Sequence, residues 1–139
     1  MRAAGSSTAP DTASVDTAPR YGLGESERRV GRALRDLPRD RVVVSTKVGR
    51  LLRPGADGPP PWVMDFSAAA LRASLDASLE RLGLPGVDIL FLHDPDDHYA
   101  EALETGFPTL AALRDEGVVG AIGAGMNQSE MLADFVRRT

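Results

Sequence analysis

The sequence predicts an α/β fold in which helical crossovers connect the strands of a parallel sheet. Segments typical of strands alternate with segments typical of helices four times along the chain, which is the pattern of such a sheet. Two of the strand segments, residues 42–44 and 87–93, are largely apolar rather than alternating, as strands covered on both faces are. No internal sequence repeat occurs beyond this alternation.

The composition is that of a folded, globular protein: 139 residues, of which 42% are hydrophobic and 26% charged. A net charge of −4 leaves no basic footprint for nucleic acid or an anionic membrane, and the absence of cysteine excludes disulfides and thiolate metal sites. No apolar run approaches a membrane span, and the N-terminal stretch lacks the apolar core of a secretory signal, so we expect a cytoplasmic location. Residues 1–14, rich in Ala, Ser and Thr, predict a disordered tail before a domain over residues 15–139.

The first strand and helix stand at the front of the predicted domain. The segment ASVDTA, residues 13–18, predicts a short strand that ends at Asp16. The segment GESERRVGRALRDLP, residues 24–38, predicts a helix that Pro38 ends, because proline cannot continue it. The expected apolar stripe of this helix consists of Val30, Leu34 and Leu37.

A segment rich in glycine and proline separates the second strand from its helix. Residues 41–49, RVVVSTKVG, predict a buried strand. Residues 53–62, RPGADGPPPW, predict irregular structure because Gly and Pro dominate them. Ser67 is expected to begin a helix that ends at Gly83. The apolar face of this helix is expected to consist of Leu71, Leu75, Leu79 and Leu82.

Two further strand–helix pairs complete the predicted sheet. Residues 87–93, VDILFLH, form the third strand, and residues 99–116 predict one broken helix or two short ones. Pro108 causes the break, and proline fits best in the first turn of a new helix. Residues 117–127 predict the fourth strand, and residues 128–139 the last helix.

Polar residues stand at the same structural place on all four strands. Asp16, Lys47, His93 and Asn127 each follow or end a strand, and Tyr21 lies in the loop after the first. Taken singly, each has an ordinary explanation, such as a solvated lysine, a structural histidine or a turn-forming aspartate. In parallel α/β folds, however, ligands and catalytic groups collect at the carboxyl ends of the strands. Their recurrence on consecutive strands therefore predicts one site at this rim.

The chemistry of these residues suits hydride transfer to or from a carbonyl carbon. Reduction of a carbonyl needs a proton on its oxygen, and oxidation needs that proton removed. Tyrosine, with an unperturbed pKa of about 10, exchanges protons poorly near neutrality, and a nearby ammonium favours the phenolate. We expect Lys47 to supply this charge to Tyr21 and Asp16 to hold Lys47 as an ion pair. His93 would hydrogen-bond the substrate oxygen, and the amide of Asn127 would pair with another amide, such as a nicotinamide carboxamide.

Four segments of the chain resemble elements of the aldo-keto reductase family. DTAPRYG is similar to the family's Asp-x4-Tyr element, STKVG to its lysine strand, DILFLHDPDDH to its histidine strand, and GAIGAGMNQ to the strand that contacts the nicotinamide. By this match Asp16, Tyr21, Lys47 and His93 would be the family's catalytic tetrad, with Tyr21 as general acid in reduction and general base in oxidation. Asn127 would bind the nicotinamide carboxamide and Asp16 would also face the cofactor, which would be NAD or NADP. Tyr21 and His93 would also contact the substrate.

The resemblance also implies a fold and a substrate class. The family's (β/α)8 TIM barrel needs about 250 residues, so this chain would form a partial barrel of about four βα units, the second to the fifth. RYGLGESERRVGRALR, STKVGRLLRP and LHDPDDHY resemble the branch of sugar dehydrogenases that act on D-threo-aldoses and L-fucose, together with related pyridoxal dehydrogenases. The implied reaction is oxidation of the C1 hydroxyl of an aldose, or reduction of a carbonyl. Many members carry Ser before the nicotinamide-binding Asn, where this chain has Met126.

Three stretches allow other interpretations. The glycines of GLGESERRVG lack the spacing of a nucleotide-binding loop, and a loop that carries Tyr21 explains them better. DPDDH, residues 94–98, could be read as a metal cluster, but a solvated acidic turn is the simpler interpretation and no metal is predicted. Trp62 is expected either to wall the substrate pocket or to lie in a flexible, exposed loop.

A partial barrel would affect both stability and activity. Open outer strands and an open apolar interior favour self-association or aggregation, and loss of the family's late loops would weaken cofactor binding. The alternative to an enzyme is therefore a catalytically inactive, truncated half-barrel remnant or an interaction module. The expected partner is a small-molecule sugar or carbonyl compound, with no nucleic acid and no membrane.

Overall fold

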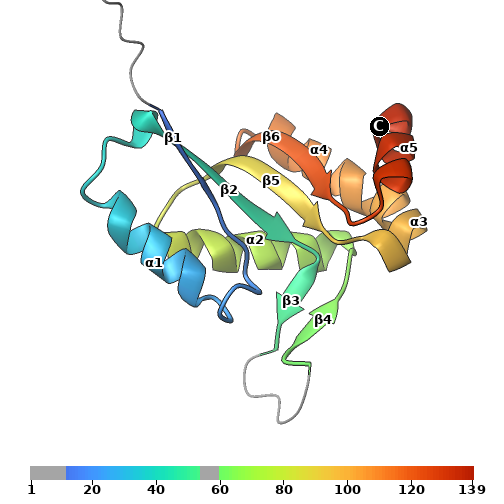
Figure 1. The fold of residues 1–139 in the computed structure, drawn as a ribbon, viewed down its shortest axis with the longest axis horizontal. Helices are drawn as coiled ribbons and strands as arrows, with labels where there is room; N and C mark the ends of the chain where they lie inside the picture. Colours follow the sequence, from blue (N-terminus) through green and yellow to red (C-terminus); the bar gives the residue numbers. More distant parts are fainter. Residues whose placement is uncertain (1–11, 54–59) are drawn as a thin grey trace, which may run out of the picture.

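The computed structural model describes residues 12–53 and 60–139, and its main feature is a four-stranded parallel sheet with the order β1-β2-β5-β6 (Figure 1). The strands of this sheet are β1 Ala13–Asp16, β2 Val42–Val48, β5 Val87–His93 and β6 Val119–Gly125. The longer helices are α1 Glu25–Leu34, α2 Ala68–Leu82, α4 Phe107–Asp115 and α5 Ser129–Arg138. Each strand of the sheet leads into a helix, so the predicted α/β fold and its parallel pairing are confirmed.

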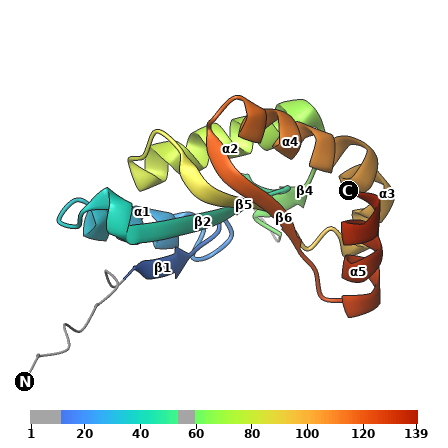
Figure 2. The ribbon, with the colours of Figure 1, turned by 90° about the horizontal axis from the view of Figure 1, so that it is seen from above.

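The sheet is curved, and Figure 2 shows α1, α2 and α4 on its convex face. Burial follows this arrangement, because successive side chains of a strand point to opposite faces. On β5, Leu90 and Leu92 are fully buried, whereas Ile89 and Phe91 are half-buried. Val43 on β2 is also half-buried, between fully buried neighbours. The architecture is that of part of a (β/α) barrel, in which the helices cover the outside and the other face belongs to the interior.

Helix α2 forms as predicted and supplies much of the core. The Ser67 hydroxyl accepts a hydrogen bond of 3.4 Å from the backbone N–H of Ala70 and caps the N-terminus, while Gly83 ends the helix at a φ of 67°. The helix packs on the sheet through three of the four predicted leucines, which are Leu71, Leu75 and Leu82. Leu79 is partly buried against the same cluster.

The buried face of α1 differs from the predicted stripe. Leu37 lies beyond the end of the helix and is 50% exposed, whereas Glu27, Gly31 and Leu34 are the buried residues. The reason is a close approach of α1 to the end of α2. A Cβ atom at Gly31 would lie 2.5 Å from the backbone oxygen of Leu82, so only glycine allows this distance. The prediction for Leu37 is therefore wrong.

The stretch RPGADGPPPW is not irregular throughout, which differs from the prediction for residues 53–62. An antiparallel hairpin, β3 Arg50–Leu52 and β4 Trp62–Met64, includes its last residue, while residues 54–59 lie outside the described ranges. Gly49, with a φ of 103°, turns the chain out of β2 into this hairpin. The backbone N–H of Asp65 then donates to the Gly49 carbonyl oxygen at 3.0 Å and closes the base.

The remaining elements follow the predicted order. A short helix α3, Tyr99–Glu101, continues through a π-helical turn, Ala102–Gly106, into α4, and Pro108 lies in the first turn of α4. Residues 1–11 of the predicted tail lie outside the described ranges, and Ala13 and Ser14 already belong to β1. Within the described ranges, no helix combines the length and the apolar character needed to cross a membrane.

The outer edges of β1 and β6 bear on whether the isolated chain associates with other copies. In the described part of the chain, β1 pairs only with β2, and β6 only with β5. Unpaired strand edges next to a half-covered apolar face are templates for pairing with other chains. We therefore expect the isolated chain to form oligomers or aggregates as its concentration rises, measured by size-exclusion chromatography with light scattering. A single monomer peak across the whole concentration series would contradict this expectation.

Candidate active site

The candidate site is built around Lys47, whose side chain is largely buried near the carboxyl end of β2. Its Nζ donates hydrogen bonds to Asp16 Oδ2 at 2.7 Å and to the Thr17 carbonyl oxygen at 2.9 Å. Parallel pairing of β1 with β2 places Asp16 level with Ser45, whose hydroxyl donates to Asp16 Oδ1 at 2.6 Å. The register of these two strands thus fixes the ion pair between Asp16 and Lys47.

Tyr21 reaches this ion pair from the loop between β1 and α1. The ammonium nitrogen of Lys47 lies 4.9 Å from the centroid of the Tyr21 ring, and Tyr21 is 40% exposed. Gly22 and Gly24 both have positive φ, a conformation that glycine adopts without strain. The glycines therefore serve the turn that carries Tyr21, and the phenol lies at the open rim of the sheet.

His93 ends β5 and is buried against Tyr21, with ring centroids 6.0 Å apart and the rings nearly perpendicular. Burial lowers the pKa of His93 from 6.5 to about 4 because it penalises the charged imidazolium. The carboxylate of Asp94 acts in the opposite direction. Three cations that lower this pKa further are those of Arg50, Lys47 and Arg20. At neutral pH the imidazole is therefore uncharged.

An ion pair that the sequence did not reveal lies beside His93. Arg50, the first residue of β3, places Nη2 2.7 Å from Asp94 Oδ2. The guanidinium carbons of Arg50 and Arg20 lie 4.8 Å and 5.3 Å from the centroid of the Trp62 ring, within the range of cation–π contacts. Trp62 thus lies in strand β4 of the hairpin, in contact with Arg50 of β3 and with Arg20 of the Tyr21 loop, rather than in a freely exposed loop.

Asn127 is not drawn into this cluster. It lies in the loop after β6 and is exposed, and its backbone N–H donates to Asp96 Oδ1 at 3.0 Å. The same oxygen accepts a bond of 3.2 Å from the Gln128 N–H, so Asp96 ties the loops after β5 and β6 together. Among the residues that the structure describes, no group of three His, Cys, Asp or Glu side chains could hold a metal ion. Within DPDDH, Asp94 accepts a hydrogen bond from the Arg50 guanidinium and Asp96 accepts from two backbone N–H groups.

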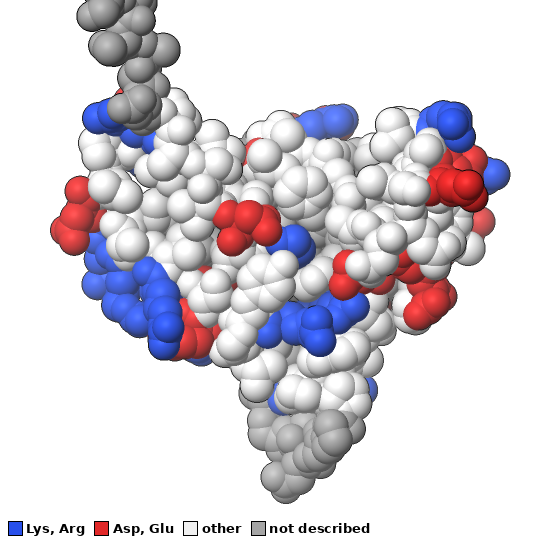
Figure 3. Space-filling view, viewed as in Figure 1, with Lys and Arg blue, Asp and Glu red and all other residues white. Residues whose placement is uncertain are grey.

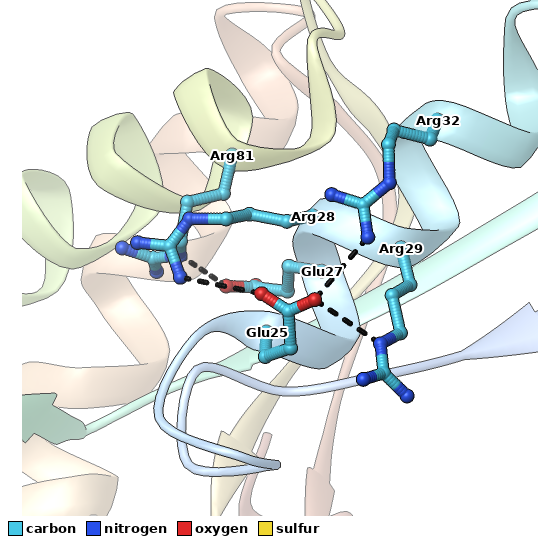
Figure 4. Close-up of polar contacts among 6 residues, drawn as sticks. All are labelled: Glu25, Glu27, Arg28, Arg29, Arg32 and Arg81. Carbon is cyan, nitrogen blue, oxygen red and sulfur yellow. Dashed lines mark hydrogen bonds and ion pairs between the residues drawn. The ribbon is translucent and has the colours of Figure 1, made fainter.

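A buried carboxylate on α1 contacts the strand that carries Lys47. Glu27 on α1 accepts hydrogen bonds from the hydroxyl of Thr46, at 2.7 Å, and from Nε of Arg81 on α2, at 2.6 Å. Figure 4 shows this pair next to the exposed Glu25, whose carboxylate faces arginines of the same helix. Glu27 stands three residues before Val30 and seven before Leu34, so helical periodicity places it on the apolar face of α1. The predicted stripe omits it because glutamate is rarely buried without a partner. Through Thr46, this contact joins both helices to the strand that carries Lys47.

The site is an open rim rather than a closed cavity. In the space-filling view of Figure 3, acidic and basic side chains lie next to each other near the middle of the face seen in Figure 1. A hollow of about 570 Å³ lies nearby, and its lining includes Pro19, Leu23 and Leu52 but none of the four residues Asp16, Tyr21, Lys47 and His93. These four residues are here called the tetrad. The candidate site is therefore identified by the chemistry of the tetrad and not by the size of the hollow.

Comparison with known proteins agrees with this geometry. Residues 12–135 match the model of the aldo/keto reductase family. The chain is 46% identical to D-threo-aldose 1-dehydrogenase from Pseudomonas sp over 88% of its own length and 42% of that protein's. It is 36% identical to pyridoxal 4-dehydrogenase from Microbacterium luteolum over 86% of its length and 43% of that protein's. The chain thus spans less than half the length of these curated relatives, and the resemblance found in the sequence is confirmed.

Solved structures give the same result for the fold. Glycerol dehydrogenase from Gluconobacter oxydans superimposes with a TM-score of 0.74 at 31% identity, over 91% of this chain and 38% of that one. An aldo-keto reductase from Klebsiella pneumoniae in complex with NADPH gives a TM-score of 0.68 at 27% identity, again over 91% of this chain and 38% of that one. The described sheet and helices therefore correspond to part of a larger barrel.

Proposed function

Because the chain belongs to the aldo/keto reductase family, we propose that the protein carrying it is an NAD(P)-dependent oxidoreductase that oxidises the C1 hydroxyl of an aldose or reduces a carbonyl. The observation that carries the proposal is the contact series from Asp16 through Lys47 to Tyr21, with 2.7 Å between the first two and 4.9 Å from the ammonium to the phenol ring. It combines a proton donor with a fixed positive charge at the carboxyl ends of parallel strands.

Tyr21 would act as the general acid in reduction and the general base in oxidation. Its exposed ring can meet a substrate, and the Lys47 ammonium next to it stabilises the phenolate that forms when the proton leaves. Lys47 is the only lysine in the chain, whose other basic side chains are all arginine. A compact ammonium differs from a planar guanidinium in its hydration and hydrogen-bond geometry, so the single lysine at this position favours a chemical role.

His93 would orient the substrate oxygen. Because its imidazole is uncharged at neutral pH, one ring nitrogen carries a proton and can donate a hydrogen bond. Nδ1 is buried and has no hydrogen-bond partner among the described residues, so a proton there would be unsatisfied. The proton is therefore better placed on Nε2, from which His93 can donate to the oxygen that exchanges a proton with Tyr21.

The residues present also fit a nicotinamide. The exposed side-chain amide of Asn127 makes no hydrogen bond to the described residues, so its donor and acceptor are both available to a carboxamide. A bound NAD or NADP would accept the hydride during oxidation and supply it during reduction. The Klebsiella relative in complex with NADPH supports this cofactor class.

The proposal is tested by following the hydrogen on C1 of the sugar. With a D-threo-aldose deuterated at C1, we expect deuterium in the reduced nicotinamide recovered from a protein that carries this sequence in a complete barrel, as measured by mass spectrometry. The same sugar deuterated at C2 should transfer none, and Lys47→Met should slow the transfer. Absence of deuterium transfer from aldoses and other alcohols with either cofactor would refute the proposed function.

A second candidate is a non-catalytic interaction module. The edges of β1 and β6, which are unpaired among the described residues, and the half-covered apolar face favour this role for the isolated chain. Cofactor-dependent turnover by the isolated chain would exclude it.

A further inference from the structure

Asp94 has two possible partners at the end of β5. Its Oδ2 lies 2.7 Å from Nη2 of Arg50 and 3.7 Å from Nε2 of His93. The side chains of Arg50 and Asp94 are only 14% and 25% exposed, so water screens their attraction weakly. Asp94 also has a φ of 44°, a left-handed conformation that is uncommon for a residue other than glycine. The carboxylate is thus held in a defined place, on the side of Arg50.

Arg50 is itself fixed by the hairpin. It is the first residue of β3 and pairs with Met64 of β4. Its guanidinium carbon lies 4.8 Å from the centroid of the Trp62 ring, on the neighbouring strand. The planar guanidinium can stack on an aromatic ring and bond a carboxylate at the same time, which an ammonium does less well. Arg50 therefore connects the hairpin to the loop that follows His93.

We propose that Arg50 is a positioning residue of this site: it holds the Asp94 carboxylate away from His93 and leaves the imidazole Nε2 for a substrate oxygen. The inference rests on the proposed function, because that function gives His93 its task. Nδ1 of His93 is buried and has no hydrogen-bond partner in the part of the chain that the structure describes, so Nε2 is the nitrogen left to bind a ligand. A carboxylate that closed the gap of 3.7 Å would occupy this nitrogen.

The same movement would change the charge of His93. A carboxylate in contact with an imidazole favours the protonated ring, which can no longer accept a proton. The elements around His93 present one negative charge and three positive ones, and β6 places Gly125 opposite it. The charged groups are Asp94 in the following loop, Arg50 on β3, Lys47 on β2 and Arg20 in the Tyr21 loop. Loss of Arg50 would both release the carboxylate and remove a cation, and both effects favour the charged ring.

The test is an NMR titration of the His93 ring proton. The chain has only two histidines, so His98→Gln leaves a single histidine signal. In this background we expect a midpoint near pH 4, and Arg50→Met should move it towards the ordinary value of 6.5. Arg72→Met, which removes a guanidinium on α2 that pairs with Glu116 at the C-terminal end of α4, is the matched control and should leave the midpoint unchanged.

A double substitution separates position from charge. Asp94→Asn alone should lower the His93 midpoint. When Arg50→Met is added to Asp94→Asn, the midpoint should rise much less than it does when Arg50→Met is made with Asp94 present. An equal rise in both backgrounds would show that Arg50 acts only through its own charge, and no rise in either would remove its role altogether; both results overturn the inference. If Arg50→Met fails to fold, as judged by circular dichroism, a rise in the midpoint on Asp94→Asn alone overturns it. The titration needs neither cofactor nor sugar, so its failure is distinguishable from a failure of deuterium transfer.

Discussion

Replacement of Tyr21 by phenylalanine should lower turnover by about 10²–10⁴-fold, the usual contribution of general acid–base catalysis, while the cofactor binds as before. The substitution removes one oxygen and keeps the ring, so the packing against His93 and the position above Lys47 are retained. The loss therefore reports proton transfer rather than disorder in the loop. The measurement is kcat together with the cofactor dissociation constant, in a protein that carries this sequence within a complete barrel.

The chain offers a matched control for this substitution. Tyr99 is its only other tyrosine, and the Tyr99 hydroxyl donates a hydrogen bond of 2.6 Å to Asp134 on α5. Tyr99→Phe removes the same atom at a place remote from the tetrad loop, so it should affect stability and leave kcat unchanged. If Tyr21→Phe retained full turnover, Tyr21 would not be the proton donor, and the assignment of the tetrad would have to be revised.

The tetrad could be predicted because a parallel sheet converts order along the chain into proximity. Asp16, Lys47 and His93 each stand at the carboxyl end of a strand, and adjacent parallel strands bring those ends to one rim. The ion pair between Asp16 and Lys47 needs only this register. Tyr21 follows five residues after Asp16, so a short turn is enough to return its ring to the same place.

The supporting contacts could not be predicted because they depend on how separate elements meet. Arg50 reaches Asp94 after Gly49, at a φ of 103°, turns the chain out of β2 into the hairpin, and the direction of that hairpin relative to the sheet cannot be read from a stretch rich in Gly and Pro. Helical periodicity assigned Leu37 to the core, yet the helix ends before it. Glu27 lies on the same helical face as Val30 and Leu34, but glutamate is rarely buried without partners. Its partners Thr46 and Arg81 come from other elements, so its burial could not be predicted from the helix alone.

Replacement of Glu27 by leucine should destabilise the chain by about 3–5 kcal/mol, the usual loss when one member of a buried ion pair is removed. The carboxylate is fully buried and is the acceptor for both the Arg81 guanidinium and the Thr46 hydroxyl. Without it, a positive charge and a hydroxyl lose their partner in a place with little access to water. Urea unfolding at constant m-value measures the loss as a lower midpoint.

Two further variants separate the buried charge from a general effect on α1. Glu25 lies two residues before Glu27 on the same helix, and its carboxylate faces Arg29 and Arg32 at 3.1 Å and 3.2 Å. Because this carboxylate is exposed, Glu25→Gln should change the urea midpoint far less than Glu27→Leu. Combining Glu27→Leu with Arg81→Met should recover much of the lost stability, because apolar side chains of similar volume can replace a buried ion pair at little cost. An equal loss for Glu25→Gln, or no recovery in the double variant, would contradict this account. Since Thr46 directly precedes Lys47, the same contact links the packing of α1 and α2 to the position of the ammonium beside Tyr21.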